Sequence, residues 1–573
     1  MQERLLQILK YYWGYDSFRP GQLDIIQSIL SGNDTLALMP TGGGKSLTFQ
    51  VPALFKPGLC LVVSPLVALM KDQVKNLRRL GILASFISSE MPRHEILQQI
   101  DNCILGDYKF LYISPERISS EIFQNKLSQL ALKTNLLVVD EAHCISQWGN
   151  DFRPNYRLIA DIRDVLPRIP VLAVTASATP AVTADICEQL HYRKGYKVYA
   201  SSFARPNLSF VVRQTEDKGA ELCHILSSVA GPAIVYCRTR RGTEEYAARL
   251  RGSKISAECY HAGLDPSIRN ARQNAWQNGV TRVLVATNAF GMGIDKGDVR
   301  LVIHPNFPDS IEAYYQEAGR AGRDGERAYA VALMGSRDLG EIKKRPASAF
   351  PSIEYITRVY EAICNRFQLA VGDGEGVSGY FVVNDFLHDF HFDRTRLFAS
   401  LNILSLSGYI KFEPYPDAKP YLRCDRDRRE LNGFLSGDSP AAELAIAILR
   451  NYEGIFSSGA FVNVQTLAAI TCQAPEMVTK LLGYLRNVGF FYIPARKEPK
   501  VTFLTIRVPL ERLVISKSSY DDRLAIFSQR IEKVLEYLTT SQCRQEFISE
   551  YFGMEGMPCR CCDNCLSTHH IKK

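Results

Sequence analysis

The segment MPTGGGKS at residues 39–46 decides the fold of the N-terminal part of the chain. It follows a short apolar run and precedes a helical pattern, so it predicts a strand, a loop and a helix in succession. Consecutive glycines permit a turn whose backbone N–H groups point at phosphate oxygens. Lys45 would then reach the β- and γ-phosphates, and Ser46 would hold Mg²⁺. Met39 replaces the first glycine of the general phosphate-loop pattern, but a tight turn without a ligand is disfavoured because Lys45 and Ser46 are both present.

Two carboxylates follow a second apolar strand in the segment LLVVDEAH at residues 136–143. Ligands of open parallel sheets bind at the carboxyl ends of the strands. We therefore expect Asp140 to hold Mg²⁺ and Glu141 to orient or deprotonate an attacking water. Taken alone, an Asp-Glu pair after a strand more often caps a helix. The phosphate loop upstream reverses that preference.

Short apolar runs alternate with helical patterns from Leu36 to about Ala330, which is typical of parallel α/β sheets buried on both faces. The segment Arg205-Pro206-Asn207 interrupts the pattern and divides it into two lobes. We expect a ligand in the cleft between these lobes. The composition, 46% apolar and 22% charged, excludes a largely disordered chain, and the net charge of +8 permits a polyanionic partner without requiring one.

The chain changes character beyond about Arg345, where helical patterns dominate and buried strands are few. Three predicted helices, AAELAIAILRNYEG, VQTLAAITC and APEMVTKLLGYLRNVG, precede the β-rich segments FFYI and VTFLTIRV. Three helices and a two-stranded ribbon form a winged-helix pattern. Basic residues in this part would either read DNA or lie on a solvated surface, and the sequence leaves both interpretations open. These residues are Lys480, Arg486, Arg496, Lys497 and Lys500.

Four cysteines near the C-terminus have the spacing of a metal site. Cys543 precedes two CxxC steps that are formed by Cys559, Cys562 and Cys565. Four thiolates at this spacing predict a tetrahedral structural Zn²⁺ site with no open position for catalysis. Cys561 is an extra cysteine that would either replace a neighbouring ligand or remain a free thiol. A disulfide knot is the alternative, which we do not expect because the first residues of the chain show no export signal.

Several ordered motifs resemble those of the RecQ family of superfamily-two DNA helicases. Besides the two segments above, these motifs are YDSFRPGQ at 15–22, VVSPLVALMKDQV at 62–74, ISPERI at 113–118, CISQWGNDFRPNY at 144–156, TASAT at 175–179, ATNAFGMGIDKGDVRLVIH at 286–304 and YYQEAGRAGRDG at 314–325. The resemblance covers residues 1 to about 340. It implies two RecA-like lobes and an ATP-dependent DNA helicase with 3′-to-5′ polarity.

The resemblance also implies roles for residues of this chain by position. Tyr15 and Arg19 would stack on adenine, and Gln22 would read the edge of the base. Two arginines of the second lobe would reach the γ-phosphate across the cleft, and Gln316 would couple the nucleotide to that lobe. The expected nucleotide-binding residues are Tyr15, Arg19, Gln22, Thr41, Gly42, Gly43, Gly44, Lys45, Ser46 and Asp295, and the expected catalytic residues are Lys45, Asp140, Glu141, Gln316, Arg320 and Arg323.

Two further segments would couple ATP to DNA. Trp148, Phe152 and Arg153 resemble an aromatic-rich loop that senses single-stranded DNA by stacking on bases, with packing between the lobes as the alternative. Ser177 and Thr179 would couple hydrolysis to lobe closure, although short hydroxyl residues at a strand end can equally cap a helix.

The zinc module resembles that of the family, including YFG after the first cysteine, but its position differs. In the family's common layout the zinc module follows the lobes directly and a winged helix follows the zinc, whereas here the segment from about Arg345 to Tyr520 intervenes. We expect this segment to replace the usual winged helix, with neither that domain nor a helicase-and-RNase-D C-terminal domain after the zinc module. The predicted domains are helicase lobe 1 at 1–203, lobe 2 at 204–344, a helical winged-helix-like segment at 345–430, a winged-helix-like domain at 431–515 and the zinc module at 516–573.

The sequence thus predicts an α/β protein that uses ATP, Mg²⁺ and Zn²⁺ and unwinds duplex or branched DNA in recombination and repair. Two other hypotheses remain: a translocase or RNA helicase that does not unwind DNA, and an architectural DNA-binding protein with a nucleotide clamp. Intact Lys45, Glu141, Arg320 and Arg323 argue against a clamp, which has no need of a hydrolytic carboxylate. We further expect a cytoplasmic monomer, nucleoid-associated in a bacterium, without a membrane segment and with a single-stranded-DNA-binding protein as a partner.

Overall fold

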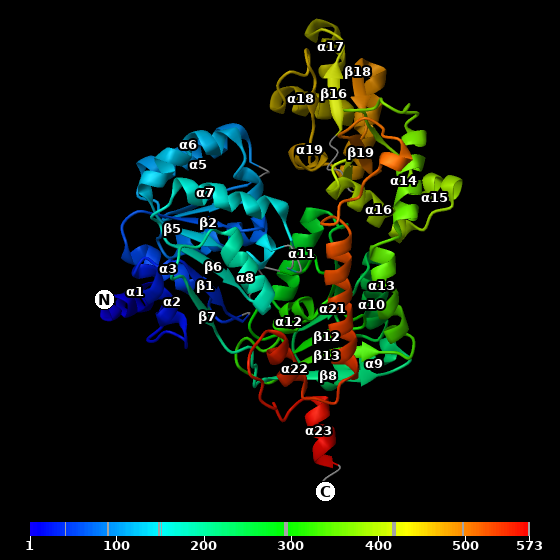
Figure 1. The fold of residues 1–573 in the computed structure, drawn as a ribbon. Coiled ribbons are helices and arrows are strands. Elements are labelled where there is room, and N and C mark those ends of the chain that lie inside the picture. The colour runs from blue at the N-terminus through cyan, green and yellow to red at the C-terminus, as the bar shows by residue number, and fades with distance from the viewer. Residues whose placement is uncertain are drawn as a thin grey trace. The chain divides into compact units, whose positions relative to one another are not determined.

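The computed structural model describes residues 1–40, 42–88, 91–146, 149, 152–291, 296–414, 420–495 and 498–570. These residues form two compact units, one made of residues 1–343 together with 526–573 and the other of residues 344–525. The first unit contains two parallel sheets, which are drawn mostly in blue to cyan and in green in Figure 1. In the part of the chain that is described, no helix is both long enough and apolar enough to cross a membrane.

The first sheet forms lobe 1 and has the strand order β3-β4-β2-β5-β6-β1-β7, with all paired strands parallel. Its strands are β1 (Thr35–Leu38), β2 (Leu59–Val63), β3 (Ala84–Ile87), β4 (Phe110–Ile113), β5 (Thr134–Val139), β6 (Val171–Thr175) and β7 (Lys197–Ala200). Its helices are α1 (Gln2–Trp13), α2 (Gln22–Leu30), α3 (Leu47–Phe55), α4 (Val67–Arg79), α5 (Arg93–Leu105), α6 (Glu121–Lys133), α7 (Ile159–Val165) and α8 (Pro180–Gln189).

Helices cover both faces of this sheet, which explains why its central strands are continuous apolar runs. The side chains of α2, α3 and α4 form one core with the sheet, and those of α5 to α8 form the other. The order β5-β6-β1 sets three strands side by side. Their carboxyl ends carry the DEAH segment, the TASAT segment and the phosphate loop, so the topology brings these three motifs together.

The second sheet forms lobe 2 and has the strand order β10-β11-β9-β12-β13-β8, again with parallel pairing. Its strands are β8 (Leu208–Gln214), β9 (Ala233–Tyr236), β10 (Ala257–Tyr260), β11 (Val283–Ala286), β12 (Leu301–His304) and β13 (Ala328–Met334). Its helices are α9 (Lys218–Ser228), α10 (Arg240–Gly252), α11 (Pro266–Gln277), α12 (Ile311–Ala318) and α13 (Asp338–Ala349). The predicted α/β class with two parallel-sheet lobes is confirmed.

The C-terminal helices complete the core of lobe 2. One face of the sheet is covered by α9 and α10. The other is covered by α11 and α12 together with α21 (Asp521–Thr539) and α22 (Arg544–Tyr551), which belong to the segment of the four cysteines. Ile531, Val534 and Tyr537 of α21 are buried in this core, and α23 (Asp563–His570) follows α22. The cysteine-rich segment is therefore built into lobe 2.

The second unit, residues 344–525, contains two subdomains with the same order of elements: helix, strand, helix, helix, strand. The first consists of α14 (Ile353–Arg366), β14 (Ser378–Tyr380), α15 (Val383–Phe390), α16 (Arg394–Leu406) and β15 (Ile410–Glu413). The second consists of α18 (Pro440–Asn451), β17 (Ala460–Phe461), α19 (Val464–Thr471), α20 (Pro475–Tyr484) and β18 (Phe490–Ile493), with α17 (Arg428–Leu435) before it. Each subdomain has its own apolar core.

The two subdomains exchange their central strands. β16 (Tyr421–Cys424) follows β15 in the chain but lies between β17 and β18 of the second subdomain. β19 (Lys500–Phe503) follows β18 but lies between β14 and β15 of the first. The chain therefore passes between the two subdomains twice, once between β15 and β16 and once between β18 and β19.

This exchange corrects the predicted two-stranded ribbon. FFYI and VTFLTIRV, taken above as partners, supply strands to different sheets. Buried and more exposed residues alternate along each of the two strands, but this alternation does not specify the partner strand. Arg486, one of the candidate DNA-reading residues, donates hydrogen bonds to the Tyr492 carbonyl of β18 at 2.6 and 3.2 Å. Its guanidinium therefore stabilises the second subdomain through a contact within it. Arg496 and Lys497 lie outside the described residues.

Candidate active site and zinc centre

The loop after β1 turns at Gly42 and Gly44, whose φ angles of 79° lie in the left-handed region that favours glycine. A Cβ on Gly44 would also collide with Nε2 of Gln22. Helix α3 begins directly after Ser46, so its first free N–H groups face the loop. Lys45 and Ser46 thus lie where a phosphate would bind. Thr41, also predicted for this site, lies outside the described residues.

Arg19 and Gln22 support this loop from the side. The Arg19 guanidinium donates a hydrogen bond to the Gly42 carbonyl. The Gln22 amide donates to the carbonyls of Gly43 and Gly44 at 3.3 and 3.0 Å, and its oxygen accepts from the Arg19 N–H at 2.9 Å. Sequence reasoning did not find these loop contacts, because the resemblance suggests only contacts with the base.

Asp140 and Glu141 come directly after β5. Asp140 accepts hydrogen bonds from the Glu141 N–H at 2.9 Å and the Ser64 hydroxyl at 3.4 Å. Glu141 has a φ of 47°, a left-handed conformation that costs a non-glycine residue about 1 kcal/mol or more. Its carboxylate lies 3.6 Å from Nζ of Lys45 and 3.4 Å from Nδ1 of His143. The strained backbone thus directs Glu141 between two partners.

The two carboxylates have opposite pKa shifts. Burial, followed by the neighbouring charge of Glu141, raises the pKa of Asp140 to about 6. Burial also acts to raise the pKa of Glu141, but Lys45, His143 and Arg320 outweigh it and lower that pKa. Glu141 is therefore ionised at neutral pH. Asp140 is a desolvated carboxylate that a divalent cation would stabilise, so the residues present fit Mg²⁺.

Lobe 2 contributes three polar side chains from α12 and the turn after it. Gln316 donates a hydrogen bond to the Ser177 hydroxyl at 2.6 Å and so joins α12 to the end of β6. Arg320 is buried and lies close enough to Glu141 to lower the pKa of that carboxyl. Arg323 packs against the phosphate loop, because its Cγ would be 3.2 Å from a Cβ on Gly42.

One cavity of about 780 Å³ collects these groups, a size suited to a nucleotide. The predicted residues that line it are Tyr15, Arg19, Gln22, Gly42, Gly44, Lys45, Ser46, Asp140, Glu141, Gln316, Arg320 and Arg323. The Tyr15 side chain is 52% exposed at this wall, as a ring that stacks on a base must be. Gly43 lies in the loop, and Asp295 lies outside the described residues.

The segment after the DEAH motif is described only in part. Trp148 lies outside the described residues. Phe152 is half-buried under the guanidinium of Arg157, at 5.3 Å from the ring centroid, and Arg153 donates a hydrogen bond to the Pro65 carbonyl at 2.9 Å. In the TASAT segment, Thr179 caps α8 by accepting from the Val182 N–H at 3.4 Å. Thr179 therefore has the structural role that was the alternative for it.

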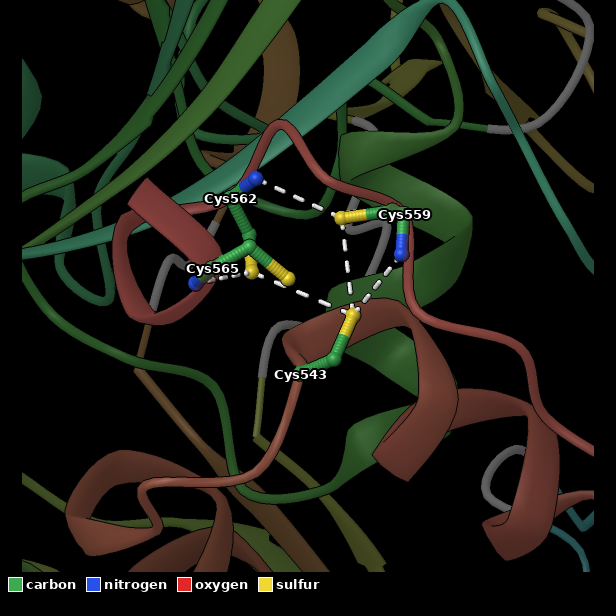
Figure 2. A group of neighbouring side chains, drawn as sticks. All are labelled: Cys543, Cys559, Cys562 and Cys565. Atoms are coloured by element: carbon green, nitrogen blue, oxygen red, sulfur yellow. Dashed lines mark hydrogen bonds between the residues drawn. The ribbon is translucent and has the colours of Figure 1, made fainter. Parts of the chain in front are cut away.

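The four predicted cysteines meet at one point (Figure 2), with their sulfur atoms within 4.8 Å of one another. The Cys543 sulfur lies 3.5 Å from that of Cys559 and 3.9 Å from that of Cys562. A tetrahedral zinc site with bonds of about 2.3 Å has sulfur atoms about 3.8 Å apart, so these residues fit Zn²⁺. Cys561 is buried but is not one of the four that converge in the described structure.

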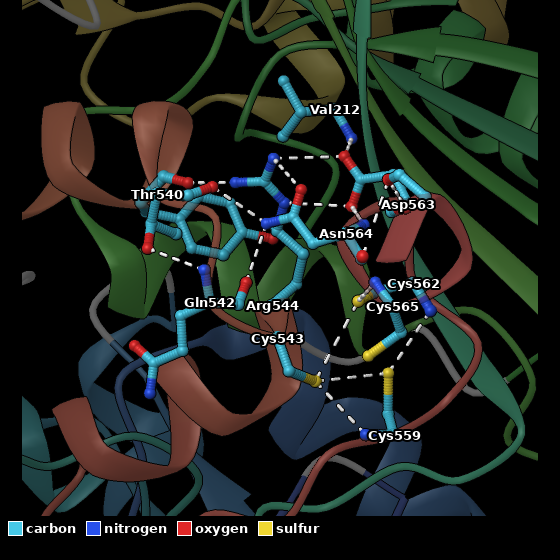
Figure 3. Close-up of polar contacts among 12 residues, drawn as sticks. Val212, Thr540, Gln542, Cys543, Arg544, Cys559, Cys562, Asp563, Asn564 and Cys565 are labelled. Atoms are coloured by element: carbon cyan, nitrogen blue, oxygen red, sulfur yellow. Dashed lines mark hydrogen bonds and ion pairs between the residues drawn. The ribbon is translucent and has the colours of Figure 1, made fainter. Parts of the chain in front are cut away.

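A polar network ties this cysteine group to lobe 2 (Figure 3). The Arg544 guanidinium donates to both carboxylate oxygens of Asp563, at 3.0 and 3.1 Å. Asp563 in turn accepts from the Val212 N–H of β8 at 2.9 Å. Arg544 and Asp563 each directly follow a predicted zinc ligand. Sequence reasoning nevertheless missed that they join the cysteine group to lobe 2, because Val212 is 351 positions from Asp563 in the chain.

Comparison with known proteins places these features in a family. Three family models match the chain: the DEAD/DEAH box helicase model at residues 19–186, the helicase conserved C-terminal domain model at 217–325, and the RecQ zinc-binding model at 508–566. The ATP-dependent DNA helicase RecQ of Bacillus subtilis strain 168 is 42% identical over 342 residues, which are 59% of this chain and 57% of that protein. The probable ATP-dependent DNA helicase RecS of the same strain is 41% identical over 344 residues, 59% of this chain and 68% of that protein. The chain belongs to the RecQ family.

This RecQ-family chain spans little more than half the length of the first curated relatives. It covers 57% of RecQ of Bacillus subtilis strain 168 and 54% of RecQ of Pasteurella multocida strain Pm70. Two crystal structures of the DUF1998 helicase MrfA bound to DNA, with and without AMPPNP, have TM-scores of 0.51 and 0.50. They share 18% and 19% identity with this chain, cover 60% and 58% of it, and are themselves covered to 52% and 51%. At this identity the likeness concerns the fold alone.

One further pair stands out in the RecQ-family site. His143 is 2% exposed, and its Nδ1 lies 2.9 Å from the Thr175 hydroxyl. It therefore links the DEAH segment to β6 while contacting Glu141. The histidine was visible in the motif, but its partner could be found only once the strand order placed β6 beside β5.

Proposed function

We propose that this chain is an ATP-dependent DNA helicase that moves 3′ to 5′ and separates the strands of duplex or branched DNA. One observation carries the proposal: Lys45 and Glu141 of lobe 1 and Arg320 and Arg323 of lobe 2 line the same cavity. A site divided between two lobes changes when the lobes move, so nucleotide turnover can drive their motion along a strand. Membership of the RecQ family supports DNA as the substrate.

Different residues of the chain would have different roles in ATP hydrolysis. Lys45 and the loop N–H groups would hold the phosphates, and Ser46 and Asp140 would hold Mg²⁺, which neutralises phosphate charge. Ionised Glu141 would accept the proton of the attacking water. Arg320 and Arg323 would stabilise the charge that develops on the transferred phosphoryl group.

Other predicted residues complete the proposal. Trp148, Phe152 and Arg153 follow the DEAH segment closely in sequence, so a base stacked there would lie near the hydrolytic carboxylate. Tyr15 and Asp295 would contact the nucleotide. The four converging cysteines would hold one structural Zn²⁺.

Steady-state ATPase and strand displacement test the proposal together. We expect ATP hydrolysis that single-stranded DNA stimulates, and separation of a duplex with a 3′ tail but not of one with a 5′ tail. Stimulated hydrolysis without separation of any DNA duplex would indicate a translocase, or an RNA helicase if matched RNA is separated. DNA binding without hydrolysis would indicate an architectural protein with a nucleotide clamp.

We also propose that the acting form is a monomer, because one chain supplies both sides of the described cavity. Its place would be the cytoplasm, at the nucleoid in a bacterium, where the single strands it produces would meet a single-stranded-DNA-binding protein. Light scattering at working concentration, with and without DNA, tests the monomer.

A further inference from the structure

The turn Tyr551-Phe552-Gly553 lies between Cys543 and Cys559 in the sequence. It packs on the linker between the two lobes, which contains Phe203 and Arg205. Phe552 directly follows α22 and is only 3% exposed. Its ring stacks on Phe203 of the linker, with centroids 4.4 Å apart and an angle of 10° between the planes. Tyr315 of α12 packs against both rings, at 5.4 Å from each, and donates a hydrogen bond to the Phe203 carbonyl at 3.1 Å.

The neighbours of Phe552 contact the lobes on either side. The Tyr551 hydroxyl donates to the buried carboxylate of Glu312 on α12 at 2.9 Å. Gly553 has a φ of 78°, and a Cβ there would lie 2.6 Å from Cγ of Pro180, the first residue of α8 in lobe 1. Three consecutive residues thus touch lobe 2, the linker and lobe 1 in turn.

The same linker holds the loop that carries the two arginines. Two residues after Phe203, the buried guanidinium of Arg205 donates hydrogen bonds to three carbonyls of that loop. The distances are 3.1 Å to Gly319, 2.8 Å to Ala321 and 3.1 Å to Gly322. These carbonyls flank Arg320 and immediately precede Arg323, so a shift of the linker would move both arginines.

We propose that Phe552 is a positioning residue for ATP hydrolysis: it fixes the linker at Phe203 and, through Arg205, the loop of Arg320 and Arg323. The zinc module would then set the geometry of an active site to which it contributes no lining residue in the described cavity. This inference rests on the proposed ATPase. Nucleotide binding uses mainly lobe 1, so loss of Phe552 should lower kcat and leave nucleotide affinity unchanged.

Phe552→Leu is the direct test, and Phe547→Leu is its matched control. Phe547 lies on the same helix, is similarly buried at 6% exposure, and packs against Tyr537 of α21 at 5.5 Å. We expect Phe552→Leu to keep about one zinc per chain and wild-type affinity for a fluorescent ATP analogue, while its DNA-stimulated kcat falls ~10-fold, since small displacements of catalytic groups cost this much or more. The control should keep a kcat within about twofold of wild type, because it leaves the linker contact intact.

Phe203→Leu, alone and combined with Phe552→Leu, closes the test. If the two rings act as one contact, the double variant should lose no more kcat than the greater single loss. A Phe552→Leu kcat equal to that of the control, or multiplying losses in the double variant, would overturn the inference. If Phe552→Leu loses zinc, Phe203→Leu decides alone, because it lies outside the zinc module: a wild-type kcat would overturn the inference. A wild-type chain without ATPase would instead refute the proposed function.

Discussion

Glu141 lies between Lys45 and His143 on a backbone in the left-handed region, which favours glycine. Replacing it with glutamine keeps the size and removes the charge, so the proposed base is lost while Asp140 remains to bind a cation. We expect Glu141→Gln to lower DNA-stimulated kcat by at least ~10²-fold with nearly unchanged nucleotide affinity, which steady-state kinetics and a fluorescence titration measure. Glu95→Gln, on exposed helix surface, is the control. Turnover at the wild-type rate would remove Glu141 from the mechanism.

Lys45 differs from Glu141 in what its loss should change. It is placed to hold phosphates in the bound state, so Lys45→Ala should weaken nucleotide binding itself. A fluorescent-nucleotide titration should show a Kd at least ~10-fold higher than that of wild type, by loss of a charged hydrogen bond. An unchanged Kd would mean that the loop does not hold the phosphates.

Asp34, which directly precedes β1, stabilises lobe 1 through buried ion pairs and a hydrogen bond. The buried carboxylate pairs with Arg163 at 2.9 Å and with Arg193 at 2.8 Å, and accepts from the Val171 N–H at 3.0 Å. Burial alone would raise the pKa of Asp34, but the hydrogen bonds from Arg193 and Val171 and the charge of Arg163 lower it. A lowered pKa means that the stabilisation is complete above the ordinary carboxyl pKa of about 3.9 and is lost as the pH falls through the folded-state value.

Asp34→Asn should therefore lower the Tm at pH 7 and make the Tm less sensitive to acid below about pH 4, where the wild-type carboxylate becomes protonated. The expected cost at pH 7 is about 3–5 kcal/mol, because two arginines lose their buried partner. Thermal unfolding from pH 7 down into this acid range measures both effects, with Asp161→Asn on the exposed side of α7 as the control. Parallel pH profiles for wild type and Asp34→Asn would contradict the pKa argument.

The cysteine group makes a prediction at the scale of the zinc module. Cys562→Ser should lose zinc, and since metal binding supplies about 10 kcal/mol or more of local folding free energy, α22 and the segment after it should lose protection from proteolysis. Cys561→Ser should retain close to one zinc per chain, because Cys561 lies outside the converging four. Metal analysis of both purified variants decides this. Full zinc in Cys562→Ser and none in Cys561→Ser would exchange their roles.

Elements were predictable from the sequence where a local pattern carries the information. The phosphate loop, the DEAH carboxylates and the CxxC steps depend on neighbouring residues, and the alternation of strands and helices orders the lobes. Strand partners were not predictable in the second unit. β18 and β19 follow one another in the chain, yet β18 pairs with β16 and β19 pairs with β15, and only the three-dimensional packing specifies these partners.

For the whole molecule, the main difference from the sequence prediction is the place of the zinc module. The cysteine spacing suggests a separate small domain, because a short segment with four thiolates can bury little apolar surface. The structure instead places α21 and α22 in the core of lobe 2, where the ring of Tyr537 lies 5.3 Å from that of Tyr314 of α12, at an angle of 52° between the planes. No local pattern pairs these rings, which lie more than 200 positions apart in the chain. The cysteine segment, the linker between the lobes and the loop of the two arginines consequently form one connected structure.

Strand separation under matched conditions tests the central claim, that a nucleotide site shared by two lobes drives unwinding. The measurement follows ATP hydrolysis and displacement of a 3′-tailed DNA duplex in the same samples, for wild type and for Arg320→Ala. We predict that wild type shows both activities, and that Arg320→Ala binds ATP and DNA but loses hydrolysis and displacement in parallel, each by at least ~10²-fold. A wild-type chain that hydrolyses no ATP with DNA present, or an Arg320→Ala variant that still unwinds at the wild-type rate, would contradict the account.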